Sequence, residues 1–259
     1  MPREFVEPGY HGKVHTHGDF VTRGLPRSFI DPWDRWLQEA IITSRQQLGD
    51  SWLNYYLISP IYRFVLSPGI CGDHGWQGVL MPSLDKIGRY YPLTVSLIDK
   101  QNINPFIALQ TKNKWFLSIE KLVRSCLEDN FNLENFNHSL SHLISETNYR
   151  TAETKQSLIP ISEKIFHHAW QQPLKSIDSI SSLLPYILDN SLKEHCFAYS
   201  LWWTQGSEHV SPSLLICEGL PHFECMAALF DGNWQKWGWE GQRYPIPPFE
   251  NYKSNPDND

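Results

Sequence analysis

Apolar residues recur at the spacing of one helical face in the segment that follows Asp31 and Pro32. Asp31 can accept hydrogen bonds from the first exposed N–H groups of a helix, and Pro32 suits the first helical position because its missing N–H is not needed there. Gly49 is typical of the residue that caps a helix C-terminus. The pattern predicts a helix from Pro32 to just before Gly49, with one buried face made of Trp33, Leu37, Ala40, Ile41, Ser44 and Leu48.

Short, strongly apolar segments between prolines and glycines predict strands. The opening stretch to about Val14 also looks extended, and a polar, glycine-containing loop follows it up to Ser28. We expect a short helical turn over Leu84–Arg89. The predicted strands are Ile61–Val65, Gly75–Met81 and Leu93–Ile98, together with two later segments at 196–204 and 213–217.

Helical spacing returns in the second half of the chain. It indicates a pair of helices within 113–146, a helix over about 178–192 in which Pro185 would interrupt the helix or start its second part, and a terminal helix over about 220–230. This order of elements lacks the regular strand–helix alternation of a doubly wound fold. The predicted fold class is therefore α/β of the mixed (α+β) type, with a largely antiparallel central sheet flanked by helices.

The length of 259 residues fits one large domain. We expect a single domain over 1–240, which could be subdivided into a strand-rich part at 1–110 and a helical part with late strands at 111–240. A proline-rich tail at 241–259 follows it.

Composition and charge exclude several classes of protein. The chain is 41% hydrophobic and 14% aromatic, which excludes a disordered chain. Its formal net charge is −6, and only 19% of its residues are charged, so it lacks the clustered Lys and Arg that phosphate contacts require. We therefore expect no nucleic acid among its partners.

Cellular location is also constrained by the sequence. The N-terminal segment lacks the apolar run of a signal peptide, and no apolar stretch approaches the roughly 18 residues of a membrane-spanning helix. The five cysteines are widely spaced without a CxxC pair, which argues against a disulfide framework or a structural zinc site. We expect a cytoplasmic protein with reduced thiols that is not an integral membrane protein.

Histidines near the N-terminus suggest a metal site. On a strand, His15, His17 and Asp19 would share one face, with His11 nearby, and imidazole with carboxylate can hold zinc or iron. Spacing alone does not establish convergence, so a polar loop without metal is the favoured interpretation. A metal-dependent hydrolase that uses this loop stays open as an alternative function.

A Ser-based hydrolase is a second catalytic alternative, with Ser83, Asp85 and a distant histidine. No GxSxG motif surrounds Ser83. A serine before a short helix is more often its cap, and Asp85 would lie favourably near the positive end of that helix. We therefore expect no catalytic residue, no metal and no cofactor.

Other polar and aromatic residues within apolar segments allow two interpretations. Arg63, Asp85 and Arg89 could pair internally or form a docking surface. Internal pairing is favoured because ionisable residues within apolar segments also occur in ion-pair networks that are purely structural. Trp202 and Trp203 would point to opposite faces of a strand. Core packing is favoured for them over an exposed stacking platform, and a small-molecule sensor with a tryptophan-lined pocket stays a further alternative.

A series of short motifs occurs in a specific order. Residues 9–38 contain Gly-x-x-Gly-Lys, Gly-Asp-Phe, Leu-Pro-x-x-Phe and Pro-Trp-Asp-x-Trp-Leu. Residues 59–93 contain Arg-Phe, Pro-Gly, Gly-Val, Pro-Ser-x-Asp and Gly-Arg-x-x-Pro-Leu, and SLWWT at 200–204 and GLP at 219–221 follow. In this order the chain resembles the TagF family, also called ImpM, of accessory proteins of the bacterial type VI secretion system.

The resemblance implies a fold and a function. The fold would be a compact α/β domain of longin- or profilin-like character with additional C-terminal helices. The function would be non-enzymatic, post-translational repression of type VI secretion through the forkhead-associated component, Fha, with other secretion components as further candidate partners. The family pattern does not require histidine at positions 15 and 17, which argues against a family-wide metal site there.

A candidate partner surface combines two of the motifs. It includes the loop Gly18, Asp19 and Phe20 and the exposed part of the helix start at Trp33, Asp34 and Trp36. Aromatic anchors beside charged residues suit interface hot spots. The same aromatic residues could instead form the core.

Overall fold

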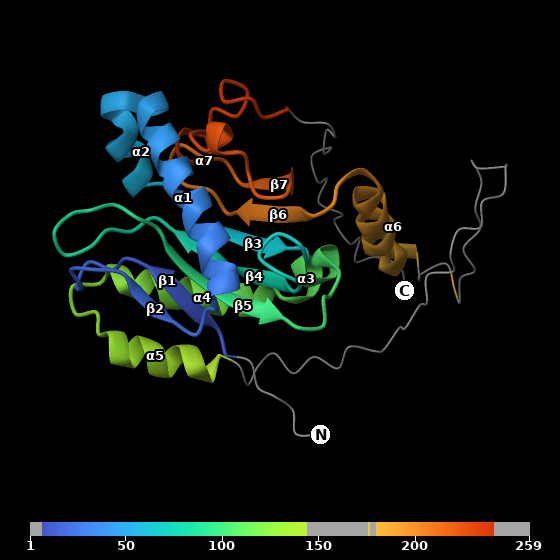
Figure 1. The fold of residues 1–259 in the computed structure, drawn as a ribbon, viewed down its shortest axis with the longest axis horizontal. Coiled ribbons are helices and arrows are strands. Elements are labelled where there is room, and N and C mark those ends of the chain that lie inside the picture. The colour runs from blue at the N-terminus through green and yellow to red at the C-terminus, as the bar shows by residue number, and fades with distance from the viewer. Residues whose placement is uncertain (1–6, 144–175, 177–179, 241–259) are drawn as a thin grey trace, which may run out of the picture.

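A seven-stranded antiparallel open sheet organises the described part of the chain in the computed structural model, which describes residues 7–143, 176 and 180–240. The spatial order of the strands is β2-β1-β5-β4-β3-β6-β7 (Figure 1). The strands are β1 (Gly9–Gly12), β2 (Val21–Arg23), β3 (Tyr62–Leu66), β4 (Gly75–Met81), β5 (Leu93–Asp99), β6 (Tyr199–Thr204) and β7 (Ser213–Glu218). This architecture confirms the predicted mixed α+β class with an antiparallel sheet.

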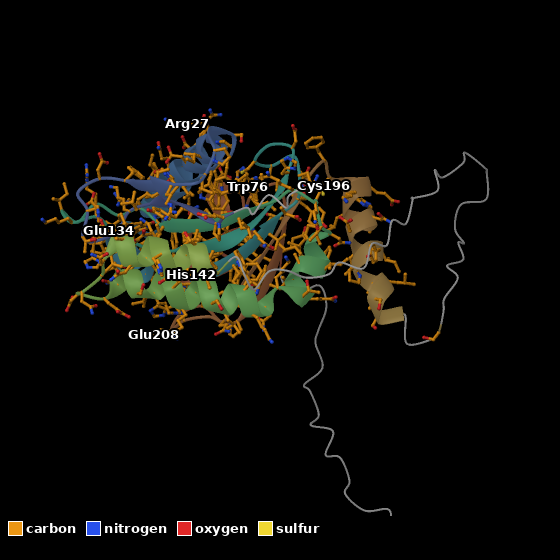
Figure 2. The ribbon with its side chains drawn as sticks, turned by 90° about the horizontal axis from the view of Figure 1, so that it is seen from below. Arg27, Trp76, Glu134, His142, Cys196 and Glu208 are labelled. Carbon is orange, nitrogen blue, oxygen red and sulfur yellow. The ribbon has the colours of Figure 1, made fainter. Side chains whose placement is uncertain are left out.

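Helices cover both faces of the sheet. One face carries α1 (Arg27–Leu48), α2 (Trp52–Leu57) and α7 (Ala228–Asp231), and the other carries α4 (Asn113–Arg124) and α5 (Leu133–His142). Figure 2 shows Arg27 of α1 and His142 of α5 on opposite sides of the sheet. Helix α3 (Pro105–Thr111) packs against α6 (Ile180–His195) at the end of the sheet.

Alternation along the strands produces two large cores, one on each face of the sheet, and Phe106, Tyr199 and Leu201 form a third, smaller cluster. On β3, Phe64 belongs to the core beneath α1, whereas Val65 belongs to the core beneath α4, because successive side chains point to opposite faces. On β6, Trp202 packs with the first core and Trp203 packs edge-on against Phe116 of α4. The favoured core packing of the two tryptophans is therefore confirmed.

The first long helix begins earlier than predicted. Its first residue is Arg27, after Pro26, so Asp31 is not the N-cap and Pro32 lies inside the helix. The N–H groups of Phe29 and Ile30 both donate to the carbonyl of Pro26, and Pro32 leaves a single interior bond unmade. The predicted C-terminal cap is confirmed, because Gly49 has a φ of 53° and donates to the carbonyl of Arg45.

Three other local predictions were wrong. The expected helical turn over Leu84–Arg89 is a tight turn closed by a bridge between Leu84 and Tyr90. Strand β2 lies within the segment predicted as a loop. The prediction missed it because three residues are too few to show the alternation of a strand. The terminal helix is divided into a 3₁₀ turn, Phe223–Cys225, and the short α7.

The remaining predicted elements are present. The predicted pair within 113–146 corresponds to α4, the 3₁₀ turn Ser125–Leu127 and α5. Helix α6 is present but runs continuously through Pro185, so the expected interruption or new start at this residue is not seen. A further 3₁₀ turn, Gly49–Ser51, links α1 to α2. No helix in the described ranges is long and apolar enough to cross a membrane. The proline-rich tail at 241–259 lies outside the described residues.

Candidate functional site

Four sequence motifs meet in one charge network that is centred on a buried carboxylate. The ammonium of Lys13 lies 3.0 Å from Oδ2 of Asp85, and Nε of Arg89 donates to the same oxygen at 2.6 Å. Arg89 also donates through Nη2 to the carbonyl of Gly18. The network thus links the Gly-Lys motif, the Pro-Ser-x-Asp and Gly-Arg motifs of the turn, and the Gly-Asp-Phe loop.

Asp85 is the centre of that network and is fully buried. Burial alone would raise the pKa of its carboxyl. The hydrogen bonds donated by the Arg89 amide, the Lys13 and Arg89 side chains and the Ile87 amide outweigh burial and lower this pKa. Asp85 is therefore held as a carboxylate and fixes the turn against β1.

Gly12 allows β1 to approach this turn. Its φ is +146°, and an added Cβ would lie 2.3 Å from the carbonyl oxygen of Pro92. A larger residue would force β1 away from the start of β5. The position of Lys13, the next residue, depends on this close approach.

Phe20 projects from the network at the surface. Its ring stacks on His11 with centroids 5.2 Å apart, and Tyr91 contacts it edge-on at 4.8 Å. The Lys13 ammonium lies 5.2 Å from the centroid of the same ring. The side chain nevertheless stays 41% exposed, so Phe20 is both positioned by the fold and available to a partner.

The loop residues beside Phe20 are exposed. A Cβ added at Gly18 would meet no described atom within 4 Å. The carboxylate of Asp19 accepts a hydrogen bond from the amide of Phe20 at 2.8 Å. This contact holds the loop in its turn without burying it.

Asp34 on α1 lies beside the same loop. The hydroxyl of Tyr91 donates to Oδ1 of Asp34 at 2.6 Å, and the amide of Gln38 donates to Oδ2 at 2.7 Å. Tyr91 also contacts Phe20, so it joins the two halves of the predicted surface. Sequence reasoning did not select Tyr91, although it lies within the Gly-Arg-x-x-Pro-Leu motif.

Trp33 and Trp36 face the core. Trp33 is fully buried, stacks near Phe64 and Trp202, and donates from Nε1 to the hydroxyl of Thr94 at 2.9 Å. Trp36 donates from Nε1 to the carbonyl of Pro221 at 2.7 Å. These two indoles belong to the core, whereas Gly18, Asp19 and Phe20 are exposed and Asp34 is partly exposed.

A surface hollow of about 460 Å³ lies between the N-terminal half of α1 and the segment that holds β1, β2 and their loop. Phe20 and Asp34 both line it, so the two predicted motifs share a concave surface. Its lining residues are His11, Phe20, Thr22, Leu25, Arg27, Ile30, Asp31, Asp34 and Gln38.

Candidate metal ligands near this hollow bond to separate groups. Nδ1 of His15 contacts the carbonyl of Cys126 at 2.8 Å, Nδ1 of His17 contacts the hydroxyl of Thr16 at 2.9 Å, and Asp19 bonds within its own loop. Over the described ranges, no group of three or more His, Cys, Asp or Glu residues could hold a metal ion.

Ser83 has a structural role different from the predicted cap. Its hydroxyl donates to the carbonyl of Lys13 at 2.7 Å, and its carbonyl accepts from the hydroxyl of Tyr56 at 2.8 Å. The hydroxyl is therefore engaged within a buried contact between β1 and the turn. The described residues directly after Ser83 form a turn and not a helix, so the predicted capping role was wrong.

Arg63 belongs to a second network on the other face of the sheet. Its Nε and Nη2 donate to the two carboxylate oxygens of Glu120 at 2.8 and 3.0 Å, and Nη1 donates to Asn113 at 3.0 Å. The ion pair is buried beneath α4. Arg63 thus pairs internally, as favoured, but it is separate from the Asp85 and Arg89 network.

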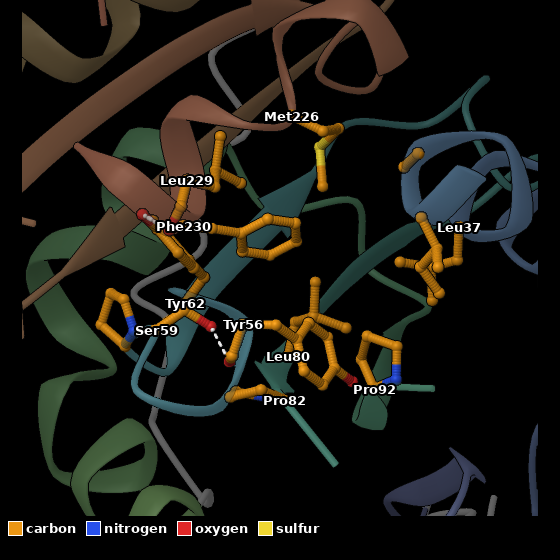
Figure 3. Close-up of a pocket in the computed structure, with 13 residues that line it drawn as sticks. Leu37, Tyr56, Ser59, Tyr62, Leu80, Pro82, Pro92, Met226, Leu229 and Phe230 are labelled. Carbon is orange, nitrogen blue, oxygen red and sulfur yellow. Dashed lines mark hydrogen bonds between the residues drawn. The ribbon is translucent and has the colours of Figure 1, made fainter. Parts of the chain in front are cut away.

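A small apolar cavity lies beneath α1 (Figure 3). Its volume is about 20 Å³, close to the minimum for one water molecule. Leu37, Tyr62 and Phe230 are among its lining residues, and tryptophan is not. The cavity is too small to bind a metabolite, so it does not support a tryptophan-lined sensor pocket.

Comparisons with known proteins agree with the motif order. The family model described as TagF N-terminal domain, type VI secretion system-associated, matches residues 9–143. The crystal structure of PA0076 from Pseudomonas aeruginosa PAO1 is similar to this chain, with 30% sequence identity and a TM-score of 0.71. The similarity covers 93% of this chain and 98% of that one. No curated protein matches this chain.

Proposed function

Because this chain belongs to the TagF family of type VI secretion system-associated proteins, we propose that it is a non-enzymatic, post-translational negative regulator of type VI secretion that binds the forkhead-associated component, Fha. The match of the TagF N-terminal domain over residues 9–143 carries this proposal. The proposal includes a cytoplasmic location and a single domain over 1–240. The longin- or profilin-like character of the fold likewise stays a prediction.

The proposed Fha-binding site is the partner surface, which we define as Gly18, Asp19, Phe20 and Asp34 with the hollow between them. Phe20 is an aromatic anchor that keeps 41% of its area exposed, while its ring is fixed by His11 and Tyr91. Pre-organised aromatic residues lose little conformational freedom on binding and are common hot spots. The buried charge network keeps the loop in this geometry in the free protein.

Repression of secretion would follow from the occupancy of Fha by this chain. A protein that binds Fha withdraws it from the productive secretion complex by mass action, and no chemical step is required. The extent of repression would then depend on the concentration of this chain relative to its dissociation constant for Fha.

Pull-down with purified Fha tests the proposal. We expect the wild-type chain to retain Fha, and we expect the double variant Asp19→Ala and Phe20→Ala to retain much less. A matched control, Ile216→Ala with Glu218→Ala, removes an exposed apolar residue and an exposed acidic residue on β7, at the opposite edge of the sheet from β2. Failure of the wild-type chain to retain Fha would overturn the proposed function. Equal retention by a folded double variant would overturn the surface.

A further inference from the structure

Asp34 is a half-buried carboxylate whose hydrogen bonds come from neutral groups. Tyr91 and Gln38 donate to its two oxygens. Among the described residues, its ion-pair partner within 4.0 Å is His11, whose Nε2 lies 4.0 Å from Oδ1. That distance is too long for a direct hydrogen bond. Partly buried charges are usually paired, so the fold leaves Asp34 with unmet attraction for a cation.

His11 does not supply that positive charge near neutral pH. Burial lowers the pKa of its imidazole most strongly; Asp34 raises this pKa to a smaller extent, and Arg27 lowers it by less still. Nδ1 contacts the hydroxyl of Thr22 at 2.8 Å, whereas Nε2 is buried without a hydrogen-bond partner. When Nδ1 carries the proton and donates to Thr22, Nε2 presents a lone pair beside Asp34.

The remaining charges of the hollow keep it negative. Arg27 and Asp31 form an exposed pair with 3.6 Å between Nη1 and Oδ1. Their charges cancel, and Asp34 is left in excess. Leu25, Ile30 and Phe20 provide apolar wall area beside these acceptors.

We propose that this hollow binds the guanidinium of an arginine side chain presented by a protein partner. The inference rests on the proposed partner surface and deepens it, because it names the side chain that the surface recognises. The observations that carry it are the uncompensated carboxylate of Asp34, the unbonded Nε2 of His11 and the concave apolar surroundings.

Arginine fits this site better than lysine. A guanidinium is planar and offers several N–H groups, so it can donate to Asp34 and His11 at the same time, whereas an ammonium is a point charge on a flexible stem. The methylene stem of arginine can pack on Leu25 and Ile30, and its plane can stack on an aromatic ring such as Phe20. Because Nε2 is covered, a small displacement of neighbouring side chains accompanies binding.

Titration of the full chain with single-residue amides tests the inference. N-acetyl-arginine methylamide is the probe, and its citrulline counterpart is the uncharged control of nearly equal shape. We expect arginine to produce saturable NMR shifts at the hollow, including the imidazole nitrogens of His11, at millimolar concentration. We expect the lysine amide to bind more weakly and citrulline to produce no saturable shift.

Variants assign the effect to Asp34. Loss of a charge-assisted hydrogen bond predicts that Asp34→Asn weakens arginine binding about tenfold or more. Asp50→Asn removes an exposed negative charge outside the hollow and is the matched control with wild-type affinity. Equal shifts from arginine and citrulline, or none from arginine, would overturn the inference. The comparison of the arginine and citrulline amides uses the wild-type chain, so it does not depend on how the variants fold.

Fha experiments separate this inference from the proposed function. Competition between the arginine amide and Fha for the wild-type chain supports both. Saturable arginine binding by a chain that does not retain Fha overturns the proposed function and leaves the arginine site standing. Retention of Fha without arginine binding overturns the arginine site alone.

Discussion

The ammonium of Lys13 lies 3.0 Å from the carboxylate of Asp85, and this carboxylate is fully buried. Through Arg89, the same carboxylate is linked to the carbonyl of Gly18 in the candidate partner loop. The shape of an exposed loop thus depends on the ionisation of a buried group. Stability and partner binding should therefore respond together when this group is altered.

Stability should fall at acidic pH because Asp85 becomes protonated. The folded state lowers the pKa of Asp85 below its unfolded value of about 3.9, so the unfolded chain binds more protons in this range. The contribution of ionised Asp85 to the free energy of unfolding is complete above about pH 4 and is lost as the pH falls below this value. We expect Asp85→Asn to be less stable at pH 7 and to show a flatter acid limb in urea unfolding. An acid limb as steep as that of Asp50→Asn would contradict this assignment.

Protonation of His11 should destabilise the folded chain, and it should do so at a higher pH than protonation of Asp85. The folded state lowers the pKa of His11 below its unfolded value of about 6.5. The contribution of His11 to the free energy of unfolding is therefore complete above about pH 6.5 and is lost as the pH falls below that value. His11→Gln should reduce the pH dependence of the urea midpoint below pH 6.5, with unchanged behaviour above it. Parallel pH profiles of variant and wild type would show that His11 does not contribute.

Removal of Glu120 should leave Arg63 as an unpaired buried charge. We expect Glu120→Ala to lower the free energy of unfolding by about 3 kcal/mol. Glu128→Ala, at an exposed residue just after α4 and its 3₁₀ turn, is the control and should change it little. The double variant Arg63→Met with Glu120→Met should be more stable than Glu120→Ala, because no buried charge is left alone. Urea unfolding at pH 7 measures all three.

Trp33 and Phe20 should separate stability from binding. Trp33 is fully buried, so Trp33→Ala should lower the free energy of unfolding by about 3–5 kcal/mol. Phe20→Ala should lower it by less than about 1 kcal/mol, because much of this side chain is exposed, while it weakens Fha binding. Chemical unfolding and the pull-down measure the two effects. A stable Trp33→Ala variant with reduced Fha binding would indicate that the indole contacts the partner.

The sequence was sufficient to predict elements whose periodicity extends over several turns or residues. The buried face of α1 and the strands β4 and β5 were predictable for this reason. The start of α1 was not, because Pro32 is favoured at a first helical position and gives no sign of the turn that precedes it. Leu84 and Ile87 likewise have helical spacing, although the hydrogen bonds that Asp85 accepts from the amides of Ile87 and Arg89 close a turn instead.

The candidate site was predictable only in part. Motif order identified the Gly-Asp-Phe loop and the segment around Asp34, but periodicity does not show which distant segments meet. The roles of Tyr91 and Lys13 depend on the pairing of β1 with β5, and that pairing places their motifs together. Trp33 and Trp36 resembled surface anchors because aromatic residues serve both cores and interfaces.

The position of β3 in the sheet has a consequence for dividing the chain. β3 pairs with β4 on one side and with β6 on the other, and in the chain the described elements β4, β5 and α3 to α6 stand between β3 and β6. A fragment that ends at residue 143 would expose one edge of a strand whose five residues are all buried. A second fragment that carries β6 and β7 would expose the matching edge. The two pieces are therefore suited to fragment complementation, in which reassembly reports that separately tagged halves have met.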